Sequence, residues 1–384
     1  MQARKLAILG IVIFGLVSLF GDIIYEGARG IIPTFLRGFG ASAFLVGIVL
    51  GLGEFLGYAL RIAFGVLSDR TRSYWAILIG GYSLIIVVPL LAIAGSWHLA
   101  VTFVLLERIS KAVRSPAKDT IFSYTTKGMG SGKAFGLHEL MDQIGAVSGP
   151  AIVAAVLFAT GENFRAAFSA LFIPYLLMLV MLAVAYTKLR PRILMPKSTS
   201  KRINFKKLPK EFTIYSVSVA LNVMGLVSVD LILYRVSPSF VPWMVALIYL
   251  AIQAVDAVAA PVAGYFYDLI GRKILYIPFA LSILPSTLIF FEGVQFVIGS
   301  AILFGVIFGM QESIYRAAVA DTTPMEVRGS AYGVFHTLYG FGFLISGAVF
   351  GYFIDNSLMY IAIPYAVAAQ MLAIFLLHKA LNKH

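Results

Sequence analysis

Three ionisable side chains lie inside the first long apolar stretch of the chain, where lipid is the expected surrounding. Asp22, Glu26 and Arg29 are spaced by four and by three residues, which places them on one face of a helix. A charge at the middle of a bilayer costs about 2.5–3.5 kcal/mol or more, so each one needs a partner, a wet cavity or a function. At about 1.5 Å per residue, Asp22 lies roughly 20 Å into this helix. A carboxylate at that depth is a candidate for binding and releasing a proton.

A second and denser set of charges lies in the apolar segment of about residues 98–124. One face of this predicted helix carries a stripe made of Glu107, Lys111, Arg114 and Lys118. Arg108 lies roughly 15 Å from the beginning of the segment, which is about the depth of Asp22. An arginine that faces a carboxylate keeps it ionised, and protonation or a substrate can break such a pair. We therefore interpret Asp22 and Arg108 as a coupling pair; the alternative is a permanent ion pair that only orders two helices.

The next apolar segment carries His138, Glu139 and Asp142, with His138 and Asp142 one helical turn apart. A histidine with two carboxylates can bind a divalent cation. Arg114 and Lys118 are expected at a similar depth and would repel such a cation. The sequence therefore favours a salt-bridge network between the two helices, and we predict no metal. His138 can still titrate near neutral pH and carry protons.

The second half of the chain has its own candidates for a cavity or for packing, which are Asp256, Glu312, Arg316 and His336. Arg235 occupies the place of Glu26 when Tyr25 and Tyr234 are matched. A bond between Glu26 and Arg235, with Arg29 nearby, would close the outer side of the protein. The alternative is that Glu26 and Arg29 form an interfacial pair that reaches the lipid headgroups.

The composition is that of a membrane protein. The chain is 60% hydrophobic and only 12% charged, with a mean hydropathy of +0.91. This much apolar surface cannot be buried in one water-soluble core. The chain has no cysteine, which excludes disulfides and thiolate sites. It also lacks a nucleotide-binding Gly-x-x-x-x-Gly-Lys-Ser/Thr loop and the HExxH and GxSxG motifs, so we expect neither an ATP-driven pump nor an enzyme, and no cofactor.

Twelve apolar segments have the length of about 20 residues that crossing about 30 Å of hydrocarbon requires. They run at about 7–35, 42–66, 75–95, 98–124, 131–159, 164–187, 211–236, 242–266, 273–292, 294–320, 329–354 and 357–381. The even number puts both termini on one side, and the first segment reads as a retained helix, not a signal peptide. The polar loop 188–210 separates two predicted domains, 1–187 and 211–384.

Positive charge gathers at the termini, in the loop 188–210 and in the short loops of the same side. The formal net charge is +12, and the segment from Lys188 to Lys210 alone holds nine Lys or Arg residues. By the positive-inside rule, this side faces the cytoplasm, across the cell (inner) membrane. Anionic lipid of the inner leaflet is the expected partner of these bases, and nucleic acid is not.

The two halves of the chain repeat each other in order. The tract Gly65-Val-Leu-Ser-Asp69-Arg70-Thr-Arg72 returns as Gly264-Tyr-Phe-Tyr-Asp268-Leu-Ile-Gly271-Arg272-Lys273, in both cases between two apolar segments. Residues 15–18 and 225–228 both read Gly-Leu-Val-Ser. The same separation of five residues recurs between Arg114 and Asp119 and between Arg316 and Asp321. This pattern predicts a duplicated transporter architecture.

With these two loop motifs, the arginine in its fourth segment and its six-plus-six layout, the chain resembles the major facilitator superfamily over essentially its whole length. The second loop has the complete family pattern, whereas the first has Arg72 in place of a glycine and Ser73 in place of a basic residue. The resemblance implies an all-α fold of twelve helices in two pseudo-symmetric bundles. It also implies alternating access through rocking of the two halves.

The resemblance further implies roles for the charged residues. Helices 1 and 4 of the family line the central cavity, so Asp22 facing Arg108 is similar to the arrangement in its proton-coupled drug antiporters. Acids at the cytoplasmic ends of helices 4 and 10 join the loop motifs in clusters that latch the outward-facing state. The implied clusters are Asp69 with Asp119, with Arg70 or Arg72 as the base, and Asp268 and Arg272 with Asp321. The alternative for these residues is helix capping and membrane topology.

These observations predict a secondary transporter that an ion gradient drives, and we expect protons. The favoured direction is efflux of a small organic compound by antiport, and we expect a monomer. One alternative is proton-coupled uptake of an organic anion, attracted by Arg108, Lys111 and Arg114. Another is a non-transporting membrane receptor or lipid-handling protein on the same scaffold. Buried titratable acids count against the receptor, because a scaffold need not carry their cost.

Overall fold

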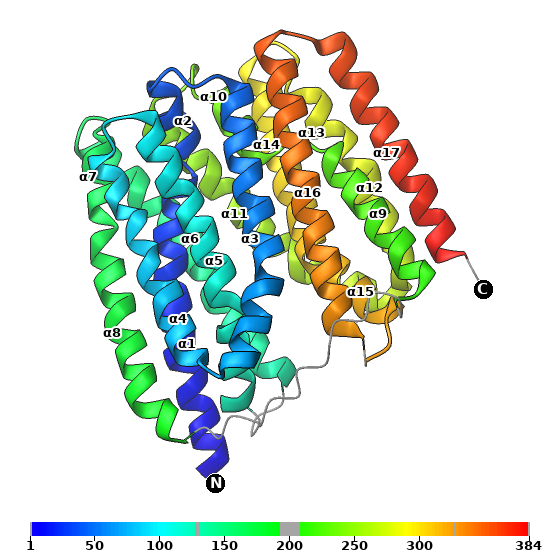
Figure 1. Cartoon of the computed structure of the whole chain (residues 1–384). Helices are drawn as coiled ribbons and strands as arrows, with labels where there is room; N and C mark the ends of the chain where they lie inside the picture. The colour runs from blue at the N-terminus through cyan, green and yellow to red at the C-terminus, as the bar shows by residue number, and fades with distance from the viewer. Residues whose placement is uncertain (1, 127–130, 193–207, 326, 383–384) are drawn as a thin grey trace. The chain divides into compact units, whose positions relative to one another are not determined.

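The chain folds into helices throughout the part that the computed structural model describes, which is residues 2–126, 131–192, 208–325 and 327–382 (Figure 1). Two compact units make up the chain. Unit 1 contains residues 1–31 and 60–201, and unit 2 contains residues 32–59 and 202–384. Residues 32–59 thus associate with the second half of the sequence. Of the predicted linker 188–210, residues 193–207 lie outside the described residues.

Unit 1 is organised around α1, which packs along α6 and α8, while α4 packs against α5. Its elements are α1 (Gln2–Arg29), the second part of α3 (Ala43–Thr71), α4 (Tyr74–Ser83), η1 (Leu84–Val87), η2 (Pro89–Ile93), α5 (Trp97–Thr125), α6 (Ser131–Ala159), α7 (Phe164–Ala170), α8 (Phe172–Leu189) and η3 (Arg190–Arg192). The boundaries of α5 and α7 follow from local capping. The side chains of Ser96 and Asn163 accept hydrogen bonds from backbone N–H groups of the first turns.

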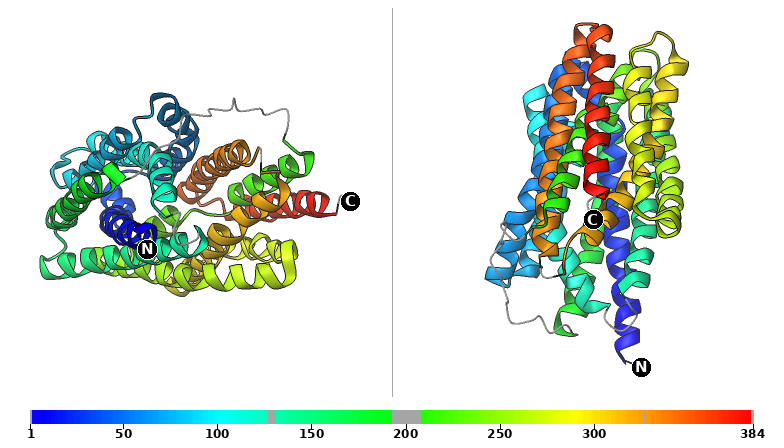
Figure 2. Two further views of the ribbon diagram at one scale, coloured as in Figure 1. Left: turned by 90° about the horizontal axis from the view of Figure 1, so that it is seen from below. Right: turned by 90° about the vertical axis from the view of Figure 1, so that its right-hand side faces the viewer.

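Unit 2 is organised around α9, which packs against α16 and α17, and around the pair α11 and α14. In the right-hand view of Figure 2, α17 (red) runs alongside α9 (green). The elements of unit 2 are α2 (Ile32–Gly38), the first part of α3, α9 (Lys210–Met224), α10 (Val229–Val236), α11 (Pro242–Ile270), η5 (Gly271–Leu275), α12 (Tyr276–Leu281), α13 (Ile283–Leu288), α14 (Val294–Met310), the π-helical turn η6 (Gln311–Tyr315), α15 (Arg316–Thr322), α16 (Arg328–Asp355) and α17 (Met359–Leu381).

Every predicted membrane segment coincides with a helix or a run of helices. Among the described residues, ten stretches are long and apolar enough to cross a membrane. The longest of them, Pro242–Leu288, has 47 residues and contains two of the predicted segments. The remaining predicted segment is α5, a 29-residue helix whose many charges lower its hydropathy. Length and apolar character therefore located the helices correctly.

Several segments that we predicted as single helices are interrupted, and this part of the prediction was wrong. Segment 75–95 changes to 3-10 geometry around Pro89, and segment 273–292 divides near Pro278 and Pro285. Proline has no backbone N–H and its ring clashes with the preceding turn, so the helix breaks or tightens there. Segment 211–236 breaks at Gly225–Ser228, and segment 294–320 widens into the π turn η6.

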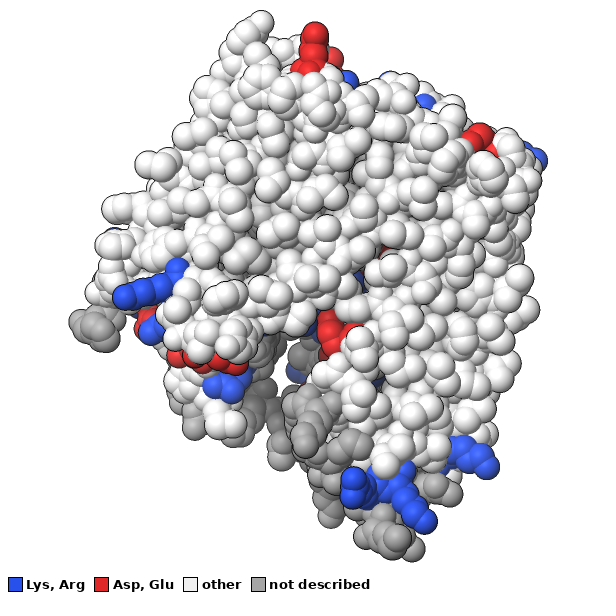
Figure 3. Space-filling model, turned by 180° about the vertical axis from the view of Figure 1, so that it is seen from behind, with Lys and Arg blue, Asp and Glu red and all other residues white. Residues whose placement is uncertain are grey.

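The outer surface of the helices suits contact with lipid. On the face shown in Figure 3, most of the surface is uncharged, and charged side chains gather towards the helix ends. Large apolar side chains are exposed on several helices, for example Phe158, Leu176 and Tyr360 at 69%, 59% and 79%. A water-soluble domain would not expose apolar side chains over so wide an area. This surface supports the membrane-spanning architecture that the composition predicts.

Glycines allow α3 and α16 to approach closely inside unit 2. A Cβ atom at Gly47 would lie 2.0 Å from the backbone oxygen of Gly347, and one at Gly51 would lie 2.7 Å from that of Phe343. No side chain fits at such distances from backbone, so only glycine permits this contact. Small residues at helix crossings are typical of membrane proteins. The contact joins a segment of the first sequence half to α16 of the second.

Candidate functional site

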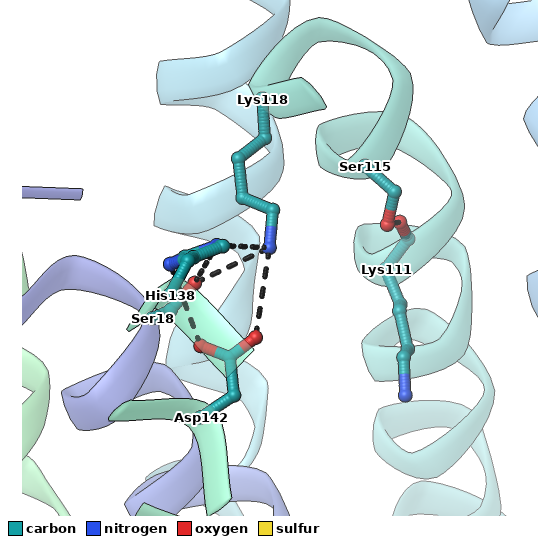
Figure 4. Close-up of polar contacts among 6 residues, drawn as sticks. All are labelled: Ser18, Lys111, Ser115, Lys118, His138 and Asp142. Carbon is teal, nitrogen blue, oxygen red and sulfur yellow. Dashed lines mark hydrogen bonds and ion pairs between the residues drawn. The ribbon is translucent and has the colours of Figure 1, made fainter. Parts of the chain in front are cut away.

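A network of charged and polar side chains joins α1, α5 and α6 inside unit 1 (Figure 4). Lys118 Nζ lies 3.0 Å from His138 Nε2, 3.3 Å from Ser18 Oγ and 3.9 Å from Asp142 Oδ2. His138 Nδ1 lies 3.8 Å from Asp142 Oδ1, and His138 Nε2 lies 3.3 Å from Ser18 Oγ. The imidazole therefore lies between an ammonium and a carboxylate. An ammonium has only donors, so His138 accepts at Nε2 and its ring proton points towards Asp142.

Further acids surround this network. The principal charged neighbours of Asp22, on α1, are Asp142, Glu26 and Lys118. Lys118 in turn interacts with Asp142, Asp119 and Asp22. The buried Asp22 and the partly buried Asp142 thus both interact electrostatically with the Lys118 ammonium, and one added proton would balance the charge of these three groups. Glu139 is exposed on α6 and acts on Asp142 from outside the network.

Arg108 has a different partner from the one that the sequence suggested. Its Nε lies 3.3 Å from Glu107 Oε2, and both side chains are buried. Among the charges that act most on Asp22, the cation is Lys118, one turn beyond Arg114 on the same stripe. Helical periodicity offered several cations of α5 as partners of Asp22, and the predicted one was Arg108. It could not distinguish between the candidates, because their order in depth depends on how α1 and α5 pack.

Two other cations of α5 lie against aromatic rings. Lys111 Nζ lies 4.9 Å from the centre of the Tyr25 ring, and Arg114 Cζ lies 5.3 Å from the centres of both Tyr25 and Tyr82. Arg114 Nη1 also donates to Ser110 Oγ at 2.8 Å, and Ser110 donates to the backbone oxygen of Gly81. Figure 4 shows that Lys111 lies apart from the network around Lys118.

Unit 2 has a polar network of another kind, made of uncharged side chains around Asn222. Asn222 Oδ1 accepts from Tyr315 Oη at 2.8 Å and from Gln311 Nε2 at 3.2 Å. Its Nδ2 donates to Gln370 Oε1 at 2.8 Å and to Ser282 Oγ at 3.1 Å. Asn222 therefore connects α9, the π turn η6, α17 and the junction of α12 and α13. All four hydrogen bonds that its amide can make are formed.

The other candidates of the second half lie near this network or apart from it. Glu312 lies in the π turn, and the Arg316 Nε donates to the backbone oxygen of Glu312 at 2.7 Å. His336 stacks on Tyr58 at a centroid distance of 5.4 Å, while Asp256 is buried on α11. Glu54, on α3, is a buried acid that escaped prediction, and it acts on Tyr339 together with Glu312. A carboxylate in an apolar segment was the signal that could have found it.

The two loop motifs share a backbone feature but differ in their contacts. Gly271 has a φ of 66°, and Arg72, at the matching position, has a φ of 56°. This left-handed region suits glycine, so an arginine there is strained. Asp69 Oδ1 accepts from Tyr74 Oη at 2.8 Å. In the first motif, Gly65 packs near Pro116 of α5, and the side chains of Arg70 and Arg72 are exposed.

In the second motif, the partner of Arg272 differs from the prediction. Arg272 forms an ion pair with Glu211 at the start of α9, and Asp321 Oδ2 accepts from Tyr267 Oη at 2.7 Å. Asp268, Arg272 and Asp321 all act on Tyr267, so they lie in one neighbourhood. Glu211 was not predicted, because it lies at the beginning of α9 and far from the motif in sequence. Gly264 lies beside Ser313 of the π turn.

Inside unit 2, two charged side chains join helices of the first sequence half to helices of the second, each by binding a helix end. Asp355, at the end of α16, accepts from the backbone N–H groups of Ala43 and Phe44 at 2.8 Å each, at the start of α3. Arg37, at the end of α2, donates to the backbone oxygen of Tyr234 and to Ser237 Oγ, both at 3.2 Å, at the end of α10. Each charge has the sign that complements the dipole of the helix end it contacts.

Of the residues predicted to close the outer side, Glu26 and Arg29 belong to unit 1 and Arg235 belongs to unit 2. Arg29 Nη1 lies 4.0 Å from Glu26 Oε1 within α1. Arg235 lines a small hollow in unit 2 together with Ser239, Phe291 and Val297. Arg37 and Asp355 were not predicted as site residues. Their role depends on the proximity of helix ends that are about 200 and 310 residues apart in sequence.

A family model settles the relationship that the loop motifs suggested. The model described as the Major Facilitator Superfamily matches residues 13–234 and 212–382, which is nearly the whole chain in two copies. The chain belongs to the major facilitator superfamily. It is therefore a multi-pass membrane protein and a secondary transporter of a small molecule, and not an enzyme. The first match extends beyond the predicted boundary at residue 187, and the two matches overlap at residues 212–234.

Relatives in sequence agree with this assignment. An uncharacterised protein of Mycobacterium tuberculosis is 35% identical over 377 residues, covering 96% of this MFS chain and 91% of the relative. An MFS-type transporter of Methanocaldococcus jannaschii is 25% identical over 353 residues, covering 88% and 87%. Both alignments extend over nearly the whole transporter, so the relationship is not confined to one bundle.

Solved structures show that the fold is shared. The nucleoside transporter NupG superposes with a TM-score of 0.72 at 14% identity, covering 98% of this chain and 100% of its own. The peptide transporter POT, in complex with sulfate, gives 0.75 at 14% identity, covering 97% and 94%. A bacterial homologue of the human lysosomal transporter Spinster gives 0.69 at 15% identity, covering 99% and 98%. The prediction of an all-α membrane protein with the MFS fold is confirmed.

Proposed function

We propose that this MFS transporter is driven by protons and exports a small organic compound by antiport. One observation carries the proposal: Lys118 Nζ lies 3.9 Å from Asp142 Oδ2, and the buried acid Asp22 of α1 interacts electrostatically with both groups. Keeping two carboxylates and a histidine inside the membrane costs free energy. Neutral side chains could join the same helices at lower cost, so the titratable groups support a role in proton transfer. The wider group around them consists of Glu26, Asp119, Glu139 and His138.

Proton binding would change the contacts of Lys118. When Asp142 is ionised, it attracts Lys118 and orients the ring proton of His138. A proton on Asp142 removes this attraction, and Lys118 then interacts mainly with Asp22. Because Lys118, Asp142 and Asp22 lie on three different helices, this exchange alters the preferred packing of α5, α6 and α1. A substrate that prefers one packing would then compete with the proton.

The orientation and the latch belong to the same proposal. Both termini and the basic segment 188–210 face the cytoplasm, where the bases contact anionic lipid. The transporter works as a monomer, and its two six-helix halves, 1–187 and 211–384, rock against each other. Asp268, Arg272 and Asp321, with Glu211, hold the cytoplasmic ends of the second half. Asp69 and Asp119 do so in the first half. Glu26, Arg29 and Arg235 take part in closing the outer side, together with Arg37 and Asp355.

Inside-out membrane vesicles test the proposal. The vesicles are acidified by respiration, and acridine orange reports the pH gradient after addition of benzenesulfonate, benzyltrimethylammonium or uridine. We expect at least one probe to dissipate the gradient with the wild-type protein. Asp142→Asn and Asp22→Asn should abolish this response, because each removes a titratable carboxylate from the shared site. Glu292→Gln, an exposed acid in the loop before α14, should respond like the wild type.

Two results would contradict the proposal. One is a probe whose transport by the wild-type protein is insensitive to collapse of the pH gradient. The other is an undiminished response in both Asp142→Asn and Asp22→Asn. Proton movement into the vesicle on addition of a probe, with the probe following it, would indicate symport. That result would favour uptake over efflux and would leave the coupling site in place.

A further inference from the structure

Arg114 is a buried cation whose polar contacts within the described chain are all with neutral groups. The residue is 5% exposed. It donates to Ser110 Oγ and lies over the rings of Tyr25 and Tyr82, and no ion pair among the described residues includes it. Lys118 and Arg108, on the same helix, each have a carboxylate within 4 Å. Arg114 therefore differs from the neighbouring cations of α5.

A buried guanidinium with only neutral contacts is incompletely compensated. A cation–π contact contributes about 0.5–2 kcal/mol, whereas desolvating an ion costs several kcal/mol. Pairing with an anion is the usual compensation for such a group. Ser110 and the two tyrosine rings hold Arg114 in place without neutralising it. They leave the remaining N–H groups of its planar fork for an acceptor.

Geometry provides an approach to Arg114. Tyr25, whose ring contacts both Arg114 and Lys111, is only partly buried, and so is Lys111. Lys111 and Arg114, at positions i and i+3 of α5, place two positive charges beside this one ring. A ligand that approaches the partly buried Tyr25 from the side of Lys111 would meet Lys111 first and Arg114 behind it.

We propose that Arg114 binds an anionic group of the transported compound, so that the substrate class is organic anions with a carboxylate, sulfonate or phosphate group. This inference rests on the proposed function and names its substrate class. A guanidinium can bind two oxygens of such a group side by side, which Lys cannot. Arg114 thereby selects for charge and for planar geometry, while the partly buried ring of Tyr25 provides aromatic surface for the rest of the compound.

Arg316 offers a matched control in the other half. Arg316 and Arg114 occupy equivalent positions in the sequence repeat, each five residues before an aspartate. Arg316 is exposed on α15 and contacts the backbone of its own helix. If anion binding needed an arginine at either position of the repeat, Arg114→Gln and Arg316→Gln would lower it equally. If Arg114 is an anion site, only its replacement should affect anion binding.

Binding to purified protein in detergent tests the inference without a proton gradient. Thermal stability and calorimetric titration are measured at constant ionic strength with benzoate, benzenesulfonate, phenyl phosphate, inorganic phosphate and chloride. Benzyltrimethylammonium and benzyl alcohol serve as the cationic and neutral counterparts. We expect the aromatic anions to bind the wild-type protein and Arg316→Gln. Arg114→Gln should lower their affinity about tenfold or more, because it removes a charge-assisted hydrogen bond.

A conservative variant separates binding from folding. Arg114→Lys keeps the charge and loses the paired N–H groups, so it should bind the aromatic anions with intermediate affinity. If Arg114→Gln does not fold, the comparison of Arg114→Lys with Arg316→Lys decides instead. Equal anion affinity in wild type and Arg114→Lys, together with wild-type affinity in any folded Arg114→Gln, would overturn the inference. So would binding of the cationic or neutral probe in preference to the anions, or no anion binding by the wild type.

The panel also distinguishes the source of the anionic group and separates this inference from the proton mechanism. Binding of inorganic phosphate or chloride as strongly as the aromatic anions would show a site for a simple ion, and would overturn the assignment to an organic substrate. Because no gradient is present, Asp142→Asn should still bind the anions, with an affinity that depends less on pH than that of the wild type. Loss of coupling with intact anion binding, or the reverse, would show which of the two proposals fails.

Discussion

The polar network of unit 1 is charged, and the network around Asn222 in unit 2 is neutral. Only the first contains groups that can bind or release a proton near neutral pH. The network of unit 1 contains an ammonium, an imidazole and carboxylates, whose contacts depend on where protons lie. The network of unit 2, around Asn222, contains only amides and hydroxyls. The amide of Asn222 already makes all four of the hydrogen bonds available to it. Unit 1 therefore contains groups that a proton can charge or neutralise, whereas the network around Asn222 is neutral.

The distinction matters because the two halves descend from one repeated architecture. Both put polar side chains at the meeting point of their first, fourth and neighbouring helices. Ionic contacts in an apolar interior change strongly with one proton, whereas neutral hydrogen bonds do not. Under the proposed function, proton binding in unit 1 would be coupled to the rocking of the two halves. The variants below test this comparison from the largest expected effect to the smallest.

Removing the centre of the neutral network should have the largest effect on stability. Asn222→Ala removes the side-chain partners of Tyr315 Oη, Gln311 Nε2 and Gln370 Oε1, each at a cost of about 1–3 kcal/mol. We expect a loss of about 3 kcal/mol or more, measured by thermal or denaturant unfolding in detergent. Thr213→Ala, which removes an exposed hydroxyl near the start of α9, is the control. A loss no larger than that of the control would show that Asn222 does not hold unit 2 together.

A charged residue at the same place would sharpen the comparison. Asn222→Asp keeps the shape of the side chain but places a titratable group in the neutral network. An ionised carboxylate there is costly, so stability should fall as the pH rises from about 5 to about 8. Wild-type stability should change less over that range. Stability that is equally dependent on pH in both proteins would remove the contrast between the units.

The ionic network of unit 1 should show strong coupling between its charges. Lys118→Gln leaves two buried carboxylates without their cation, and we expect a loss of about 2–3 kcal/mol. The double variant Lys118→Gln with Asp142→Asn should lose less than the sum of the single variants, by about 1–3 kcal/mol. Denaturant unfolding of the four proteins measures this cycle. Additive losses would mean that the contacts in Figure 4 contribute little.

Asp355 and Arg37 hold helix ends together, and we call these two contacts the clasp. Their removal should change stability less than the variants above and should act mainly on conformation. Asp355→Asn removes the negative charge at the N-terminus of α3, which contributes about 0.5–2 kcal/mol. We expect spin labels at the ends of α3 and α16 to move apart in a larger fraction of molecules. Because the chain has no cysteine, labels can be introduced by cysteine substitution without a background. Unchanged distances in Asp355→Asn and in Arg37→Gln would show that the clasp has no influence on the outer side.

The smallest effect concerns the loop motifs. Arg72→Gly should stabilise the protein by about 1 kcal/mol, because it relieves the left-handed backbone of Arg72. Gly271→Ala should destabilise it by a similar amount for the same reason. Thermal unfolding compares the two variants. Destabilisation by Arg72→Gly would mean that the exposed arginine side chain contributes more than its backbone costs.

The sequence predicted the fold almost completely, and the candidate site only in part. Length and apolar character located the predicted segments but not the breaks inside them, and the loop motifs indicated the family. The network of Lys118, His138 and Asp142 could be predicted from the sequence, because all three residues have helical spacing in charged segments. Two other contacts could not be predicted, namely Arg272 with Glu211 and Asp355 with the start of α3. Each of them joins residues about 60 or 310 positions apart. Periodicity reports the face of one helix and carries no information on which other helix end packs against it.

The tetrapeptide Gly-Leu-Val-Ser shows this division most directly. At residues 15–18 it lies within the continuous helix α1, where Gly15 packs closely on Met141 and Ser18 joins the charged network. At residues 225–228 the same four residues separate α9 from α10. There, Ser286 and Ser346 satisfy backbone groups of the break, with Val227 N donating to Ser286 Oγ at 2.9 Å. The sequence alone determined that these residues lie in membrane-spanning segments of a duplicated transporter. Only the tertiary structure decided whether the helix continues, because an exposed backbone group inside the membrane is stable only where neighbouring helices supply its hydrogen-bond partner.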